Sequence, residues 1–178
     1  MKKRKTTAIV IMIVLLGVFL FFMYSIGVKS NRKKEIAKKL ETIPQFEFFQ
    51  LNGKPFTQDS IKEQFSAIFI YFHTDCDFCS HEAESIAEHL SGLHNSQLLF
   101  ISPEPTDSIQ AFAEKKNLSN HPNVLFLQDK KRVFPVRFDV NAAPYTLVYN
   151  KNGKLIKRFN GQILAPAIIK VLQENERE

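Results

Sequence analysis

The sequence predicts one α/β domain, with a mixed β-sheet and helices on both faces, preceded by a single transmembrane helix. Three observations predict it. Strand-like and helix-like segments alternate between residues 67 and 127, Asn-Gly pairs mark hairpins at both ends of the domain, and a long apolar run lies near the N-terminus. The chain has 178 residues, of which 44% are hydrophobic and 24% charged. This composition is globular, so a disordered or collagen-like protein is excluded.

The apolar run, residues 8–28, contains no charged side chain. As a helix it would be about 30 Å long, which matches the hydrocarbon core of a bilayer. It is longer than the usual apolar core of a cleavable signal peptide, so an uncleaved anchor is favoured and cleavage remains the alternative. We therefore divide the chain into a basic tail (1–7), a transmembrane anchor (8–28), a charged linker (29–42) and a folded domain (43–178).

The positive charge of the chain belongs to its N-terminal part. The net charge is +6, but residues 1–41 hold ten Lys and Arg against two Glu, which leaves the remainder slightly acidic. A basic surface for nucleic acid is therefore not expected. Positive residues flank the apolar run on both sides, so charge alone does not decide which side of the membrane the domain occupies.

The first half of the domain is predicted to run from a hairpin through a central strand into a helix. Short apolar segments flank Asn52-Gly53, a pair typical of hairpin turns. Residues 67–72 form a continuous apolar run, which is typical of a strand covered on both faces. Residues 80–93 carry apolar side chains at helical spacing, so a helix follows this strand.

The second half continues the alternation and closes with a second hairpin around Asn152-Gly153. In chain order, the predicted elements are a strand at 97–101, a helix at 106–117, a strand at 123–127, a short helix or irregular turn at 129–138, strands at 145–149 and 155–159, and a helix at 164–173.

Cys76 and Cys79, the two cysteines of the chain, lie between the predicted central strand and its helix. In this setting their spacing is typical of a thiol–disulfide redox pair. The N–H groups and dipole of a helix N-terminus stabilise a thiolate, so Cys76 is the candidate attacking thiol and Cys79 the resolving thiol. A structural disulfide is the alternative. Zinc would need two further ligands at matched spacing, so no metal or other cofactor is expected.

A set of short motifs spans residues 43–175. They are Pro44-x-Phe46, Asn52-Gly53, the run 67–72 entering Cys76-x-x-Cys79, Glu82, Ala143-Pro144-Tyr145-Thr146 entering a strand, and Asn152-Gly153 followed by Gly161. Together they resemble the membrane-anchored TlpA/ResA branch of the thioredoxin superfamily. The resemblance implies a thioredoxin fold with an N-terminal β-hairpin extension.

The resemblance also implies how a substrate would meet the cysteines. Pro144 would be a cis-proline facing the pair, and the backbone of Ala143 would bind an extended substrate segment. Phe72, Phe78 and Tyr145 would form an apolar collar around the thiols.

The location and partners follow from the same resemblance. Such proteins work outside the cytoplasmic membrane and typically reduce disulfides, including those of apocytochromes awaiting haem. We therefore expect a single-pass cell-membrane protein with an extracytoplasmic domain. Its expected partners are protein disulfides, with apocytochrome c as one candidate, and a membrane electron donor.

The sequence departs from this family around the cysteines. The family usually has Trp before the first cysteine and Pro inside the motif, where this chain has Asp75 and Asp77-Phe78. The acid that thioredoxin buries on the entering strand falls at Ile70. Glu82 is therefore the candidate proton acceptor, and an ordinary first-turn helix glutamate is the alternative.

The two aspartates permit an inference about redox direction. Asp75 and Asp77 bring negative charge next to Cys76, which disfavours its thiolate and should raise the thiol pKa. This predicts a reducing couple and a reductase. Protonation of His73 and His81 would offset part of the effect, although both histidines are also consistent with exposed positions that have no role.

Two other functions remain as alternatives. A peroxiredoxin needs Thr or Ser three residues before its reactive cysteine and Pro seven before, but these positions hold His73 and Phe69. A copper chaperone for oxidase assembly could use the two thiolates with His73 or His121. That family, however, separates its cysteines by three residues rather than two.

Overall fold

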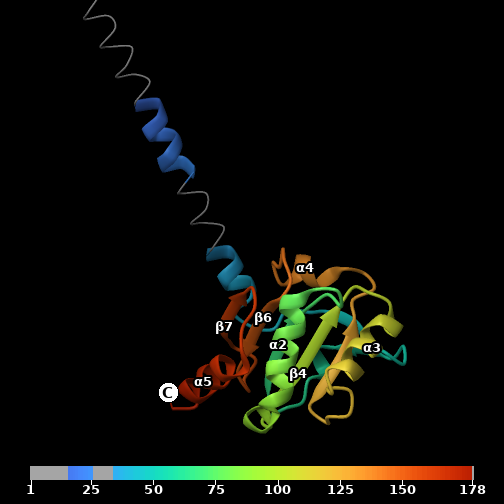
Figure 1. The fold of residues 1–178 in the computed structure, drawn as a ribbon. Helices are drawn as coiled ribbons and strands as arrows, with labels where there is room; N and C mark the ends of the chain where they lie inside the picture. The colour runs from blue at the N-terminus through green and yellow to red at the C-terminus, as the bar shows by residue number, and fades with distance from the viewer. Residues whose placement is uncertain (1–15, 26–33, 178) are drawn as a thin grey trace, which may run out of the picture. The chain divides into compact units, whose positions relative to one another are not determined.

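The computed structural model describes residues 16–25 and 34–177 (Figure 1). The chain divides into two compact units, Met1–Lys39 and Leu40–Glu178. In the first unit, residues 16–25 and 34–39 are helical. The second unit contains the sheet and both cysteines.

The predicted membrane anchor lies only partly within the described residues. Residues 16–25 of it are helical with exposed apolar side chains, whereas residues 8–15 and 26–28 lie outside the described ranges. Across residues 16–25 and 34–177, no helix combines the length and the apolar character needed to cross a membrane.

The second unit contains every strand and helix that its sequence patterns predict, with ends shifted by a few residues. In chain order the elements are β1 (Glu47–Gln50), β2 (Pro55–Thr57), η1 (Gln58–Ser60), β3 (Ser66–Tyr71), α2 (Asp77–Glu88), η2 (Leu90–Leu93), β4 (Ser96–Ser102), α3 (Thr106–Lys115), β5 (Val124–Gln128), α4 (Val133–Arg137), β6 (Tyr145–Tyr149), β7 (Leu155–Asn160) and α5 (Ala165–Asn175).

The helix predicted over residues 80–93 differs most from its prediction. It starts three residues earlier, at Asp77, because Cys76 caps it and accepts the N–H of Cys79. It ends at Glu88, because His89 leaves the helical conformation with φ −119° and ψ 20°. A short 3₁₀ helix, η2, continues the predicted apolar positions to Leu93.

The strands form one mixed seven-stranded sheet in the order β2-β1-β5-β4-β3-β6-β7. Strands β3, β4 and β5 are parallel, and all other pairs are antiparallel. The two predicted hairpins are β1-β2 and β6-β7. The β1-β2 hairpin comes from the N-terminal part of the domain and extends the sheet beyond β5. Since parallel strands end at the same edge, the loops after β3, β4 and β5 meet there. The cysteines follow β3 and therefore lie at this edge.

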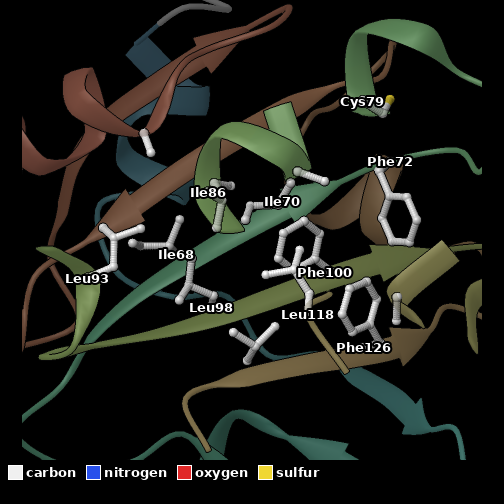
Figure 2. Close-up of a cluster of buried hydrophobic side chains, with 14 of the residues drawn as sticks. Ile68, Ile70, Phe72, Cys79, Ile86, Leu93, Leu98, Phe100, Leu118 and Phe126 are labelled. Carbon is white, nitrogen blue, oxygen red and sulfur yellow. The ribbon is translucent and has the colours of Figure 1, made fainter. Parts of the chain in front are cut away.

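One face of the sheet is covered by α2, α3 and α5. Side chains alternate along a strand, so Ile68, Ile70 and Phe72 point to this face and pack with residues of the three helices. Figure 2 shows this core, with Cys79 and Phe72 at one end of it and Leu93 at the other.

The opposite face carries an aromatic cluster and the short helix α4. Phe69 packs there against Phe134 and Phe138 of the α4 region, with ring centroids 6.4 and 5.1 Å away. Phe46 and Phe48, which lie near the start of the domain, complete the cluster. The prediction of a mixed sheet with helices on both faces is therefore confirmed.

Asp129 fixes the start of α4. Its carboxylate is fully buried and accepts the backbone N–H groups of Val133 at 2.9 Å and Phe134 at 2.8 Å. Burial raises the pKa of Asp129, and the two N–H donors partly offset this effect. The carboxylate therefore satisfies two donors that a helix N-terminus leaves unpaired.

Replacing Asp129 with alanine should lower the free energy of unfolding by about 1–2 kcal/mol, because one buried and one partly buried N–H group lose their acceptor. Urea unfolding followed by circular dichroism measures the change. Asp107→Ala is a suitable control, since Asp107 lies in the first turn of α3, which has no side-chain cap. Equal losses in the two variants would contradict the capping role.

Candidate active site

Cys76 and Cys79 form a disulfide at the N-terminus of α2, with their Cα atoms 5.2 Å apart. Cys76 is the N-cap residue, and its Sγ accepts the N–H of Cys79 at 3.2 Å. Cys76 is partly exposed, whereas Cys79 is only 3% exposed. Cys76 is therefore the sulfur that an external thiol or disulfide can reach, and the helix N-terminus favours its thiolate.

Glu104 holds the turn that leads to Cys76. Its carboxylate accepts the N–H of Thr74 at 3.0 Å and lies 3.2 Å from Nδ1 of His73. Burial alone would raise the pKa of Glu104, but these contacts hold it below its ordinary value. The carbonyl of His73 in turn accepts the N–H of Cys76 at 3.3 Å. Sequence reasoning missed Glu104, which follows β4 at the same edge of the sheet.

The peptide bond between Ala143 and Pro144 is cis, as the resemblance implied. Tyr145 begins β6 and pairs with Tyr71 at the end of β3. This register places Pro144 at the edge where the cysteine loop begins. Ala143 and Cys76 both pack against the same apolar core.

The expected apolar collar is present only in part. Phe78 is 63% exposed in the first turn of α2, and Tyr145 is largely buried. Phe72 is only 1% exposed and packs against Phe112 with ring centroids 4.7 Å apart, so its prediction as a collar residue is wrong (Figure 2). The reason is the alternation of side chains along the chain, which places Phe72 on the core face with Ile70.

Glu82 is a buried carboxyl one turn after Cys79. Its exposed fraction is 1%, which excludes an ordinary surface glutamate. One oxygen accepts the hydroxyl of Thr146 at 2.6 Å, and the other accepts the N–H of Ile163 at 3.2 Å. Burial raises the pKa of Glu82 to about 7, although both hydrogen bonds act to lower it. The group can therefore gain or lose a proton near neutral pH.

The sheet register shows which space Glu82 fills. Thr146 pairs with Ile70 across β6 and β3. The carboxyl of Glu82 thus reaches the sheet from the helix, beside the Thr146–Ile70 pair.

The charged residues of the cysteine loop lie in water. Asp75, Asp77 and His81 are exposed, so solvent screens their effect on Cys76. Lys116, in contrast, is only 6% exposed, and its Nζ donates to Ser80 Oγ and to a carboxylate oxygen of Glu84. Sequence reasoning missed this buried cation, which the fold of α3 against α2 brings close to the cysteine loop.

A metal site at the same cysteines would need further ligands beside the two sulfurs. Within the described ranges, no group of three or more His, Cys, Asp or Glu side chains is arranged to hold a metal ion. His121 precedes β5, at the edge opposite to the cysteines, and Nδ1 of His73 faces Glu104. A strand of five residues separates the two edges by about 16 Å. His121 is therefore not placed to complete a site with the two sulfurs.

Comparison with known proteins gives a family and a fold. The AhpC/TSA family matches residues 40–158. No curated protein matches the chain.

Solved structures with the same fold include a secreted disulfide oxidoreductase of Mycobacterium tuberculosis homologous to E. coli DsbE. It is 21% identical, has a TM-score of 0.63, and the match covers 77% of this chain and 98% of that one. The peroxidoxin BcpB of the same organism is 15% identical over 75% and 94% of the two chains, with a TM-score of 0.65. A thioredoxin-like protein from Aeropyrum pernix is 10% identical over 85% and 98%, with a TM-score of 0.58. The predicted thioredoxin-like fold is confirmed.

Proposed function

The chain belongs to the AhpC/TSA family and is a thiol–disulfide oxidoreductase, and from this premise we propose that it is a disulfide reductase of the TlpA/ResA type. The observation that carries the proposal is the placement of the Cys76–Cys79 disulfide. It lies at a helix N-terminus, at the same edge as cis-Pro144, with the buried carboxyl of Glu82 one turn away.

The reaction begins with the reduced form of the pair. The Cys76 thiolate attacks one sulfur of a substrate disulfide, which forms a mixed disulfide and releases the other substrate sulfur as a thiolate. Cys79 then loses its proton and attacks Sγ of Cys76, which restores the Cys76–Cys79 disulfide and releases the second substrate thiolate. Two electrons pass to the substrate, and a dithiol donor must return them to the pair.

Glu82 is proposed to handle the proton of the second step. A carboxyl with a pKa of about 7 is partly ionised at neutral pH, so it can take up the proton that Cys79 loses. The released substrate thiolates receive protons from water or from this carboxyl. Glu82 therefore couples proton movement to disulfide exchange without contacting the substrate.

The substrate segment is proposed to bind beside Pro144. An extended segment would hydrogen-bond to the backbone of Ala143 by β-strand addition, with the exposed Phe78 as its apolar contact and the largely buried Tyr145 behind it. Exposure of Phe78 at this point, on an otherwise charged loop, supports the assignment. The segment would present its disulfide to Cys76, which is the more exposed of the two sulfurs.

We propose that residues 8–28 anchor the protein and that its redox domain lies outside the cytoplasmic membrane. The length and charge-free character of this run support an anchor. The TlpA/ResA resemblance supports the extracytoplasmic side, protein disulfides such as those of apocytochrome c as substrates, and a membrane protein as electron donor. Asp75 and Asp77 support the reducing direction, since their negative charge, although screened by solvent, disfavours the Cys76 thiolate.

The full chain, reduced with dithiothreitol and freed of it, should reduce insulin disulfides in detergent solution, with one disulfide reduced per chain. Precipitation of the insulin B chain measures the reaction. Hydrogen peroxide is the matched control oxidant, because Phe69 stands buried where a peroxiredoxin needs proline. Rapid oxidation by peroxide without insulin reduction would contradict the proposal and favour a peroxidase.

A further inference from the structure

A pocket opens between α2 and α3, beside the cysteine loop. It has a volume of about 280 Å³, which is small for a drug-sized ligand but sufficient for a side chain. Its lining residues are Thr74, Ser80, Ser108, Ala111, Phe112, Lys115 and Lys116. The pocket touches the chain two residues before Cys76 and one residue after Cys79, so it adjoins the disulfide.

One face of α3 builds most of this pocket. Ala111 and Phe112 lie three and four residues after Ser108, and Lys115 lies four and three residues after them, so the four residues share a side of the helix. Phe112 is buried and forms an apolar wall, while Ala111 is exposed and leaves room that a larger side chain would fill. The pocket therefore has an apolar base and a polar rim.

The rim is rich in hydroxyl groups and carries an uncompensated cation. Lys116 is held by Ser80 and Glu84, and its hydrogen bond keeps the pKa of Glu84 below the ordinary value. Among the described residues, the side chain of Lys115 has no hydrogen bond and no ion pair, and its charge interacts with Glu84 only at longer range. One positive charge is thus left to pair with a ligand.

We propose that this pocket binds an acidic side chain of the protein substrate, one to three residues from the cysteine that Cys76 attacks. The carboxylate would pair with Lys115 and accept a hydrogen bond from the hydroxyl of Ser108. The Thr74 hydroxyl is already engaged by Glu104. An extended segment advances about 3.3 Å per residue, which sets the distance along the substrate. The inference rests on the proposed disulfide reductase and names the substrate feature that this site selects.

The preference should depend on position. Asp75 and Asp77 are exposed next to Cys76 and repel a carboxylate placed near them. A substrate acid is therefore favoured only where it reaches Lys115. Lys115 on one side and the two aspartates on the other would therefore favour one orientation of the bound segment over others.

The test uses the full chain, reduced and in detergent, with peptides in which a disulfide joins a fluorophore half to a quencher half. Within the set, one residue at a time, one to three positions from the target cysteine, is either Glu or Gln. The wild type should reduce the Glu peptide about two- to fivefold faster than the Gln peptide at one position at low ionic strength. Added salt should remove this difference.

Two variants remove the site in different ways. Lys115→Gln should abolish the Glu preference by removing the charge, and Ala111→Leu should abolish it by filling the pocket. Lys54→Gln, a change of another exposed lysine far along the chain, should keep the preference. A Glu preference that survives in both pocket variants, or is absent from the wild type, overturns the pocket assignment.

The proposed function fails in a distinguishable way. If the wild type reduces no peptide of either kind, the reductase and the pocket assignment fall together. If it reduces the Glu and Gln peptides at equal rates at every position, the reductase stands and only the pocket assignment is wrong.

Discussion

Cys76→Ser is expected to abolish disulfide reduction, with a loss of at least about a hundredfold in the rate of insulin reduction. Cys76 is the exposed member of the pair and the cap of α2, so its sulfur is the one that a substrate meets. A serine hydroxyl can still accept the N–H of Cys79, so the start of the helix should be kept. The variant thus removes the nucleophile while preserving the local structure.

The matched comparison is Asp77→Asn, which changes the neighbouring first-turn residue but leaves both sulfurs in place. It should retain disulfide reduction, because Asp77 is exposed and makes its contribution through screened charge. Circular dichroism of both variants checks their folding. Substantial reduction of insulin by a folded Cys76→Ser protein would contradict the assignment of Cys76 as the attacking thiol.

Glu82→Gln is expected to change how stability depends on pH, by about 3 kcal/mol between pH 4.5 and pH 7.5. The pKa of Glu82 is about 7 in the folded protein and 4.5 for an ordinary glutamate. A carboxyl whose pKa is raised on folding stabilises the fold below its unfolded pKa. That contribution is lost as the pH rises through the folded pKa.

Glutamine carries no charge at any of these pH values, so the variant avoids this loss. Its amide oxygen can accept the Thr146 hydroxyl, but its NH₂ group is a donor and cannot accept the N–H of Ile163. The loss of this hydrogen bond lowers the free energy of unfolding by an amount that does not depend on pH. The free energy of unfolding of the variant, relative to that of the wild type, should therefore increase as the pH rises. Urea unfolding at pH 4.5, 6 and 7.5 measures this difference.

Glu88→Gln, at the exposed end of the same helix, is the control and should show no such trend. A difference between Glu82→Gln and wild type that is the same at all three pH values would show that Glu82 is not a buried carboxyl titrating near neutral pH. In that case the proton role proposed for it would lose its basis.

The fold was predictable because its signals are local. The apolar run 67–72, the helical spacing after it and the two Asn-Gly turns each identify an element without knowledge of the rest. Cys76, Cys79 and Glu82 are adjacent in sequence, and helix geometry alone brings them together. Pro144 is distant in sequence, and it was found only through the resemblance.

The parts of the site that were missed depend on long-range packing. Glu104 contacts His73 across 31 residues, and Lys116 contacts Ser80 across 36 residues. Neither contact leaves a periodic pattern in the sequence. The prediction that Phe72 lies around the thiols was wrong for a different reason. The alternation of side chains that continues from β3 places Phe72 on the core face of the sheet, although it is near the cysteines in sequence.

The most direct test of the proposed reductase is to trap its intermediate. Cys79→Ser cannot resolve the mixed disulfide, so the full chain expressed in membranes should accumulate a covalent adduct with a cysteine-containing protein. Dithiothreitol should release the adduct, and Cys76→Ser/Cys79→Ser should not form it. The absence of any such adduct, together with stoichiometric Cu(I) binding by the wild type, would contradict the proposal and favour a copper-binding protein.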